Sequence, residues 1–194
     1  MSSPIGLIIG LGNPGIRYTM TRHNAGFWFV DGLASRSRQM FRSTARFLGD
    51  ECRIDFDGRS CRLFKPTTFM NKSGLAVATL FRYYRYAPEE ILVVHDEIDL
   101  PPGTIRLKQG GGHGGHNGLR DIMTHINTSD FNRLRIGVGH PGHRDDVVNY
   151  VLRSAPVEEQ NLMDEAIVRA YAVFGNIIDG ELARAMNTLH VSAT

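Results

Sequence analysis

The sequence predicts a single α/β domain in which a mixed β-sheet, containing parallel and hairpin strands, is flanked by helices. Strand-like and helix-like hydrophobic patterns alternate along the chain, and Asp57-Gly58 joins two β-rich runs. No linker or low-complexity tract divides the 194 residues. A chain of this length buries roughly 70% of its unfolded surface and needs no disulfide or metal to fold. We therefore expect residues 1–194 to form one domain.

Six short runs, apolar or β-rich and bounded by turn residues, predict the strands of the sheet. They are residues 5–10, 52–56, 59–64, 91–94, 104–108 and 134–138. Asp57-Gly58 joins the second and third runs into a hairpin, and Pro101-Pro102-Gly103 turns the chain so that the fifth runs antiparallel.

Apolar residues at helical spacing predict the helices that lie between and after these strands. They are residues 24–38, 75–86, 117–126, 157–178 and 181–189. Asn117 is the expected cap of the third helix, and Pro88 follows the end of the second.

The two cysteines, Cys52 and Cys61, are too few for a disulfide framework or a four-cysteine zinc site. The hairpin register places them opposite Leu63 and Ile54, as diagonal neighbours beyond disulfide reach. No apolar run approaches the roughly 20 residues of a membrane span, and we find no secretory signal. We therefore expect a cytoplasmic protein that does not contact a membrane.

Arginine dominates the basic residues, with nineteen Arg against three Lys, and the net charge is +2. The guanidinium fork matches phosphate, so this composition agrees with a polyanionic partner such as nucleic acid. A genome rich in G and C favours Arg codons and explains the same ratio. Composition alone leaves both explanations open.

The segment Gly10-Leu-Gly-Asn-Pro-Gly15 follows the first predicted strand and matches the G-x-G-x-x-G dinucleotide fingerprint. That fingerprint requires a helix to open at its last glycines, whereas Pro14 removes a donor and the next helix is expected at Asn24. We favour a turn that directs Asn13 outward from the end of the strand.

Two segments supply a histidine and a carboxylate. His23 directly precedes the first helix, whose N-terminal dipole favours a neutral imidazole that can act as a base. Asp96 ends a buried strand in His95-Asp96-Glu97-Ile-Asp99, where it can orient a histidine. The alternatives are an exposed His23 beside a helix-capping Asn24, and a metal bound by the acidic segment.

Amides and glycines gather in two further segments. In Phe69-Met-Asn71-Lys-Ser73-Gly74, Asn71 offers a donor and an acceptor to a carbonyl or an oxyanion, or else Asn71 or Ser73 caps the helix. Residues 110–118 lack the Lys-Ser/Thr of a P-loop, but their glycines let the backbone approach a ligand closely. Asn117 either faces that ligand or only caps the helix.

Basic side chains bracket this glycine-rich loop in the sequence. Arg106 and Lys108 share one face of their strand, and Arg133 and Arg135 share one face of theirs. They are either solvated surface charges or a clamp for a phosphate backbone. No Gly-x-Ser-x-Gly elbow is present and neither cysteine lies near a plausible base, so the residues favour activation of water without a covalent intermediate.

Four motifs together resemble the bacterial peptidyl-tRNA hydrolase family. They are Gly10-Leu-Gly-Asn-Pro-Gly15 with Tyr18-x-x-Thr21-Arg-His-Asn24, Pro66-Thr-Thr-Phe-Met-Asn71-Lys-Ser-Gly74, His95-Asp96-Glu-x-Asp99-Leu-Pro-Pro-Gly103, and residues 110–121. The motifs stand in the family's order and spacing, and the likeness covers roughly residues 5–190.

The resemblance implies a monomeric enzyme that cleaves the ester between a peptide and the 3′ ribose of tRNA, with no metal or cofactor. His23 would activate water, and Asp96 would orient His23. The implied substrate contacts are Asn13, Tyr18, Met70, Asn71 and Asn117, and the implied tRNA phosphate contacts are Lys108 and Arg135. Residues 140–151 match a mobile lid, and no catalytic role is assigned to His113 or His116.

Two alternatives come from other classes of protein. A non-catalytic RNA-binding module agrees with the arginine excess, but it needs aromatic stacking platforms on exposed strands, and the predicted strands show none. A dinucleotide-dependent oxidoreductase agrees with the glycine fingerprint, and a titration with NADH would reveal it.

Overall fold

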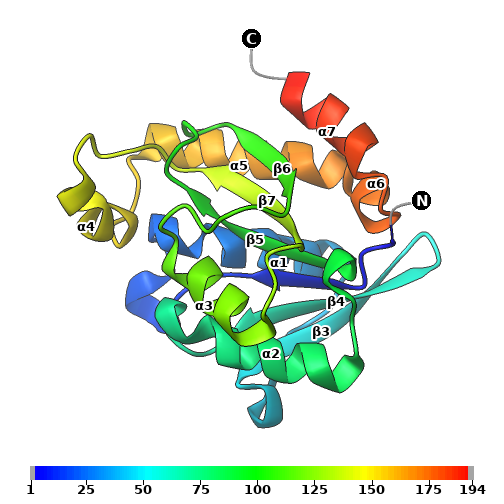
Figure 1. Ribbon diagram of the computed structural model, residues 1–194. Helices are drawn as coiled ribbons and strands as arrows, with labels where there is room; N and C mark the ends of the chain where they lie inside the picture. Colours follow the sequence, from blue (N-terminus) through cyan, green and yellow to red (C-terminus); the bar gives the residue numbers. More distant parts are fainter. Residues whose placement is uncertain (1–2, 192–194) are drawn as a thin grey trace.

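The chain forms a mixed β-sheet that lies between two layers of helices, as the sequence predicts (Figure 1). The computed structural model describes residues 3–191. The strands are β1 (Leu7–Gly10), β2 (Arg42–Thr44), β3 (Gly49–Phe56), β4 (Arg59–Pro66), β5 (Ile91–Glu97), β6 (Ile105–Gln109) and β7 (Asn132–Gly137). Their order in the sheet is β2-β3-β4-β1-β5-β7-β6.

The five predicted helices are present in the predicted order, with two differences: α4 was not predicted, and the helix predicted over 157–178 is divided in two. The α-helices are α1 (Ala25–Arg36), α2 (Ser73–Tyr84), α3 (Asn117–Ile126), α4 (Val147–Val151), α5 (Val157–Ala172), α6 (Phe174–Ile178) and α7 (Leu182–Val191). Short 3-10 turns are η1 (Ile16–Tyr18), η2 (Arg22–Asn24), η3 (Ala45–Phe47), η4 (Met70–Lys72), η5 (Pro88–Glu90) and η6 (Arg144–Asp146). The single helix predicted over 157–178 is wrong, because Val173 leaves the helical conformation (φ −105°, ψ 11°) and Phe174 turns into the core.

Strands β4, β1, β5 and β7 run parallel in the centre of the sheet, and antiparallel strands complete both sides. The chain passes from β1 to β4 on one side of β1, and then through α2 to β5 on its other side. The strand order therefore reverses at β1. In open α/β sheets, a crevice forms at such a reversal beyond the carboxyl ends of the strands.

Local sequence signals set the register of the hairpin but not the partner of every strand. Cys52 pairs with Leu63 and Cys61 with Ile54, as predicted, and both cysteines are free and buried. Strand β6 is antiparallel as predicted, but it pairs with β7, which lies between β5 and β6. The turn before β6 sets its direction, whereas packing of the whole sheet sets its neighbour.

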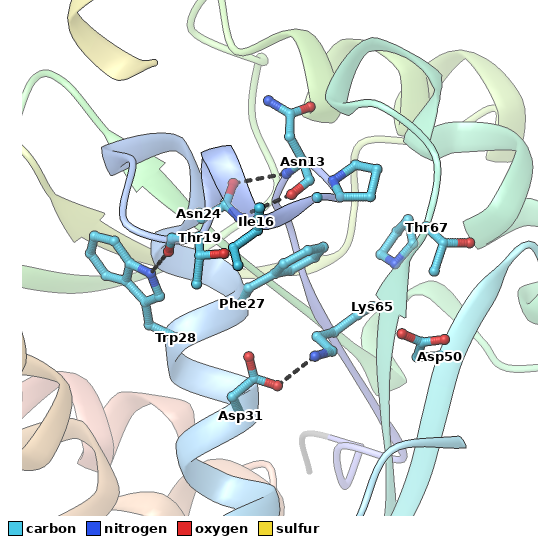
Figure 2. A pocket seen from close by; sticks show the side chains of 13 residues that line it. Asn13, Ile16, Thr19, Asn24, Phe27, Trp28, Asp31, Asp50, Lys65 and Thr67 are labelled. Atoms are coloured by element: carbon cyan, nitrogen blue, oxygen red, sulfur yellow. Dashed lines mark hydrogen bonds and ion pairs between the residues drawn. The ribbon is translucent and has the colours of Figure 1, made fainter. Parts of the chain in front are cut away.

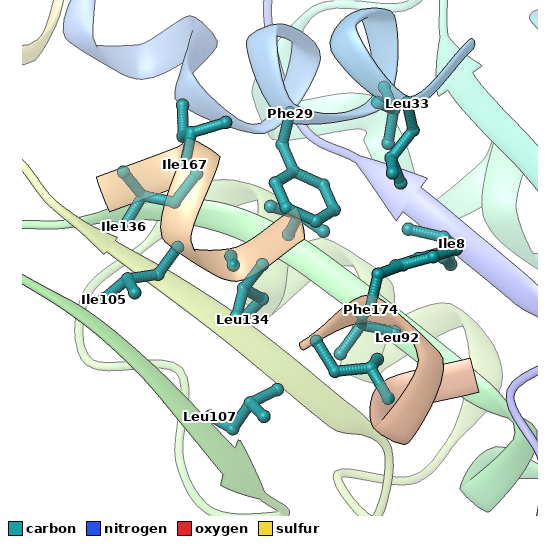
Figure 3. Close-up of a cluster of buried hydrophobic side chains, with 14 of the residues drawn as sticks. Ile8, Phe29, Leu33, Leu92, Ile105, Leu107, Leu134, Ile136, Ile167 and Phe174 are labelled. Carbon is teal, nitrogen blue, oxygen red and sulfur yellow. The ribbon is translucent and has the colours of Figure 1, made fainter. Parts of the chain in front are cut away.

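Apolar side chains cover both faces of the sheet. On one face, Phe29 of α1, Ile167 of α5 and Phe174 of α6 pack against strand residues such as Leu92 and Leu134 (Figure 3). On the other face, α2 and α3 cover alternate residues of the same strands. The continuous apolar runs of the central strands follow from this double burial.

Glycines bring α1 directly onto the sheet. A Cβ on Gly10 would overlap the carbonyl oxygen of Gly26, and a Cβ on Gly26 would overlap that of Val94. The glycines of the fingerprint therefore admit a helix rather than a pyrophosphate, and α1 begins only at Ala25, so the dinucleotide-binding alternative is wrong. This contact holds the η2 turn, with His23, above the carboxyl end of β5. Within residues 3–191, no helix has the length and apolarity needed to cross a bilayer.

Candidate active site

His23 and Asp96 meet at the crevice beyond β1 and β5. Nδ1 of His23 lies 2.9 Å from Oδ1 of Asp96, and the two residues are only 8% and 3% exposed. The sequence predicts this histidine–carboxylate pair, although 73 residues separate its members. The alternative of an exposed His23 is wrong.

His23 and Asp96 each shift the pKa of the other. Burial acts to lower the pKa of His23, but the charge of Asp96 and its hydrogen bond outweigh burial and raise the pKa above 6.5. Burial also opposes ionisation of Asp96, yet His23 and His116 hold the pKa of this carboxyl well below its usual range. Asp96 is therefore a carboxylate that accepts the Nδ1–H of His23. In the neutral imidazole, Nε2 of His23 then carries the lone pair, and this atom has no hydrogen-bond partner among residues 3–191.

His116 is a third member of this cluster, and the sequence did not predict it. Its Nε2 lies 3.0 Å from the same Asp96 oxygen, and its ring centroid lies 5.0 Å from that of His23. His116 also caps α3, since its side chain accepts a hydrogen bond from the backbone N–H of Leu119. The predicted cap, Asn117, is instead the first residue of the helix and is exposed. A histidine directly before a helix was the available signal, but nothing in the sequence placed it beside Asp96.

Asn13 is held in one orientation by backbone and side-chain hydrogen bonds. Its Oδ1 accepts the N–H of Met70 at 2.8 Å. Its backbone N–H donates to Oδ1 of Asn24 at 2.8 Å, and its carbonyl accepts from Nδ2 of Asn24 at 3.0 Å. Asn24 therefore clamps the β1 loop and makes no capping bond to α1, contrary to the alternative considered above. Because Oδ1 is occupied, Asn13 offers its Nδ2 donor to a ligand.

The two amide-bearing segments lie against each other. A Cβ on Gly118 would lie 2.6 Å from Sδ of Met70, so buried Met70 packs on the start of α3. The neighbouring residues, Asn71 and Asn117, have exposed side chains. Neither amide takes part in a hydrogen bond within the described part of the chain, and both are free to bind a substrate.

The start of α2 is capped from α3. Oδ2 of Asp121 accepts the backbone N–H of Gly74 at 2.6 Å, and a Cβ on Gly74 would overlap the carbonyl oxygen of Asp121. The predicted caps are wrong, because Ser73 is buried and donates to the Met70 carbonyl, while Asn71 makes no cap. This contact fixes the η4 turn relative to α3.

Aromatic side chains form the outer edge of the site. The ring of Tyr18 meets that of Phe69 edge-on, with centroids 6.2 Å apart, and Phe69 is 51% exposed. Phe69 was not predicted as part of the site, although an aromatic residue directly before Met70 and Asn71 was a signal of an exposed aromatic surface.

The basic side chains on one face of β6 and β7 differ in whether they are bonded within the protein. The register places Arg106 opposite Arg135 and Lys108 opposite Arg133, so all four side chains leave the same face. Arg133 is buried and donates to the Gly111 and Gly112 carbonyls, which holds the glycine-rich loop, and Arg106 donates to the Leu189 carbonyl. Arg135 is paired with Glu97 at 2.9 Å. Lys108 is exposed and has no ion-pair partner in residues 3–191.

A pocket of about 310 Å³ lies behind the Asn13 loop (Figure 2). It is lined by Phe27 and by the Asp31–Lys65 ion pair, and the Asn13 carboxamide points away from them. Neither His23 nor Asp96 lines it. This pocket is therefore separate from the histidine–carboxylate pair.

His23, Asp96 and His116 present three potential metal-ligand atoms within 4.8 Å of one another. A metal on Nε2 of His116 would require a proton on Nδ1, which instead faces the N–H of Leu119. Two histidine N–H groups converge on the Asp96 carboxylate and Nδ1 of His116 faces the Leu119 N–H, so Nε2 of His23 is the one ring nitrogen of the pair of histidines without a partner in residues 3–191. The donor set fits a proton network and does not fit a metal centre.

The segment that matches a lid is anchored beside His23. Arg22 donates to the Ser154 carbonyl at 3.1 Å and lies over the Tyr150 ring, 4.0 Å from its centroid. The Tyr150 hydroxyl in turn donates to the Val138 carbonyl. Between these anchors, the residues from His143 to Asp146 are exposed. The mobility of residues 140–151 stays a prediction.

These features define the class of the protein. It is an α/β enzyme with a buried histidine–carboxylate pair at the carboxyl ends of its central parallel strands.

Comparison with known proteins identifies the family within this class of enzymes. The family model for peptidyl-tRNA hydrolase matches residues 7–194. The chain is 52% identical over 188 residues to the peptidyl-tRNA hydrolase of Acinetobacter baylyi, with 97% of each chain covered. It is 53% identical over 184 residues to that of Halorhodospira halophila, with 95% of each covered. A crystal structure of peptidyl-tRNA hydrolase from Acinetobacter baumannii matches with a TM-score of 0.95 at 49% identity, covering 98% of this chain and 97% of that one. The chain belongs to the peptidyl-tRNA hydrolase family, and the resemblance drawn from four motifs is confirmed.

Proposed function

We propose that this chain hydrolyses the ester that joins a peptide to the 3′ ribose of tRNA, and so recycles tRNA from peptidyl-tRNA. Family membership supports the reaction. One observation carries the mechanism: His23 donates Nδ1–H to the buried Asp96, while its Nε2 has no partner in the described part of the chain. This is the arrangement of a general base that activates water.

The reaction proceeds without a covalent intermediate. Nε2 of His23 takes a proton from water, and the resulting hydroxide attacks the ester carbonyl. Asp96 stabilises the imidazolium that forms. The tetrahedral intermediate then collapses, and His23 returns its proton to the ribose oxygen that leaves. Burial supports this route, because it raises the pKa of the Cys52 thiol to about 11 and that of Cys61 to about 12, and neither serves as a nucleophile.

Three asparagines hold the substrate and the water. The Nδ2 of Asn13 donates to a peptide carbonyl, because its Oδ1 is already bound to the Met70 N–H. Asn71 holds the substrate and the attacking water. Asn117 stands at the N-terminus of α3, where its amide and the helix dipole stabilise the anionic intermediate. Tyr18 and Met70 line the same site.

Lys108 and Arg135 bind tRNA phosphate. They leave the same face of the sheet as diagonal neighbours, and the glycine-rich loop that Arg133 holds lies beside Lys108. Arg135 is paired with Glu97 in the free protein, so a phosphate would compete with the Glu97 carboxylate for the guanidinium.

The enzyme acts as a single-domain monomer in the cytoplasm, without a metal or cofactor. The His116 tautomer fixed by the α3 cap opposes metal binding. The two buried cysteines are free, which fits a reducing compartment.

The test is release of labelled N-acyl-amino acid from N-acyl-aminoacyl-tRNA by the purified protein, with and without chelator. We expect hydrolysis in both, and a rate about 10²–10⁴-fold lower with His23→Ala at matched concentration. Failure of the wild type to hydrolyse this substrate would overturn the proposal.

A further inference from the structure

His116 is hydrogen-bonded to Asp96 of the catalytic pair, and both of its ring nitrogens have partners. Its side chain is 9% exposed, and each ring nitrogen has one partner. Nδ1 meets the backbone N–H of Leu119 at 3.3 Å, and Nε2 meets Oδ1 of Asp96 at 3.0 Å.

These partners assign the tautomer of His116. The Leu119 amide can only donate, so Nδ1 of His116 carries a lone pair and no proton. Nε2 of the neutral ring must then carry the proton, and it donates to Asp96. Oδ1 of Asp96 therefore accepts two N–H groups, one from His23 and one from His116.

We propose that His116 is a positioning residue that sets the base strength of His23 through the carboxylate they share. The inference rests on the proposed role of His23 as the base. Asp96 favours the protonated form of His23. A second N–H donated to the same oxygen partly offsets the negative charge of Asp96 and so weakens this effect. The positive end of the His116 N–H dipole also lies beside His23 and opposes its protonation. His116 thereby keeps more of His23 in the neutral form that can accept a proton from water.

The other charged and titratable groups around η2 do not supply this effect. From β5, His95 is buried, with its pKa lowered to about 3 by burial and by His116, so it is neutral and adds no charge. From α4, the Tyr150 ring packs on Arg22, and Arg22 is paired with Glu159 of α5 at 2.9 Å. Among residues 3–191, Asp96 alone is hydrogen-bonded to the His23 ring, and His116 bonds to the same Asp96 oxygen.

The His116 side chain has two roles: it acts on the basicity of His23, and it caps helix α3. His116 caps the helix through one nitrogen and holds Asp96 through the other, and the next residue is Asn117. A structural role and an electrostatic role are therefore mixed in any truncation, and the test must separate them.

Two substitutions separate the roles, because each retains one nitrogen position of the ring. His116→Asn keeps an acceptor where Nδ1 stands and so keeps the helix cap, but it loses the donor to Asp96. His116→Gln keeps a donor where Nε2 stands and loses the cap. His113→Ala is the matched control in the same loop, since the His113 side chain accepts the Gly115 N–H and makes no hydrogen bond to Asp96 within residues 3–191.

The measurements are the pH profile of kcat/KM, an NMR titration of the His23 ring, and the thermal unfolding midpoint. In His116→Asn we expect the midpoint of the acid limb to rise by about half a pH unit or more, with activity close to wild type at high pH. In His116→Gln we expect the wild-type pH profile and a lower Tm. His113→Ala should match the wild type in the pH profile.

The proposal is overturned if His116→Asn loses activity equally at every pH, or if His116→Gln shows the same displaced profile. The NMR titration separates this failure from failure of the proposed mechanism. If the pKa of His23 rises in His116→Asn but kcat/KM does not follow it, then His23 is not the base, while the action of His116 on His23 stands. An unmoved pKa of His23 refutes that action directly.

Discussion

Removal of the Asn24 side chain should expose how strictly Asn13 must be held. In Asn24→Ala, the backbone N–H of Asn13 loses its 2.8 Å bond and the carbonyl of Asn13 loses its 3.0 Å bond. Both residues are buried, at 3% and 6% exposed. Each unpaired buried polar group costs about 1–3 kcal/mol, so the loss of both partners should lower the free energy of unfolding by about 2–6 kcal/mol. A domain whose stability lies in the middle of the ordinary range of about 5–15 kcal/mol remains folded after such a loss.

The loosened loop should also cost activity. A loss of about 1.4 kcal/mol in transition-state binding lowers kcat/KM tenfold, and we expect at least that in Asn24→Ala. If Asn24 acts through Asn13, the loss in the Asn24→Ala/Asn13→Ala double variant should be no larger than in Asn13→Ala alone. Urea unfolding and hydrolysis of N-acyl-aminoacyl-tRNA measure the two effects. Additive losses in kcat/KM, or an unchanged free energy of unfolding, would refute the reasoning.

Three further outcomes follow from the same geometry. Lys108→Ala and Arg135→Ala should each raise KM more than they lower kcat and should flatten the salt dependence of tRNA affinity; an unchanged KM at moderate salt would place the phosphate contacts elsewhere. Excess EDTA should leave the rate of hydrolysis intact, and a loss restored by zinc would contradict the proton network. The pKa of buried His95 is lowered to about 3, so the folded state excludes a proton that the unfolded chain binds below about pH 6.5. Between pH 7 and pH 4.5, the free energy of unfolding should therefore fall by about 2–3 kcal/mol more in the wild type than in His95→Asn. The same pH dependence of the free energy of unfolding in both proteins would show that His95 is not buried in its neutral form.

The features that the sequence predicts well are those set by neighbours along the chain. The Asp57-Gly58 turn fixes the register of its hairpin, so the partners of Cys52 and Cys61 followed directly. Asp96 was found because a polar residue at the end of an apolar strand is conspicuous in any α/β chain. His23 was found because it directly precedes a helix.

The features that were missed depend on contacts between distant segments. Arg133 and Arg135 have the same pattern in the sequence, but the glycine-rich loop folds over Arg133 and buries it. His116 has the spacing of a flexible loop residue, and only the packing of α3 beside β5 brings it to Asp96. Asn24 is an ordinary helix cap by sequence, yet close approach of α1 to β1 turns it into the clamp of Asn13. Residue type alone could not distinguish these roles.

The most direct test of the central claim is the effect of His23→Ala on kcat and on its pH dependence. General-base catalysis supplies about 10²–10⁴-fold, so kcat should fall by that factor while tRNA affinity is retained, because the phosphate contacts lie on β6 and β7. In the wild type, Asp96 raises the pKa of His23, so kcat/KM should climb with pH through a midpoint above about 6.5 and then level. This limb should vanish in His23→Ala. A variant whose kcat stays within about threefold of the wild type, with the limb intact, would contradict the assignment of His23 as the base.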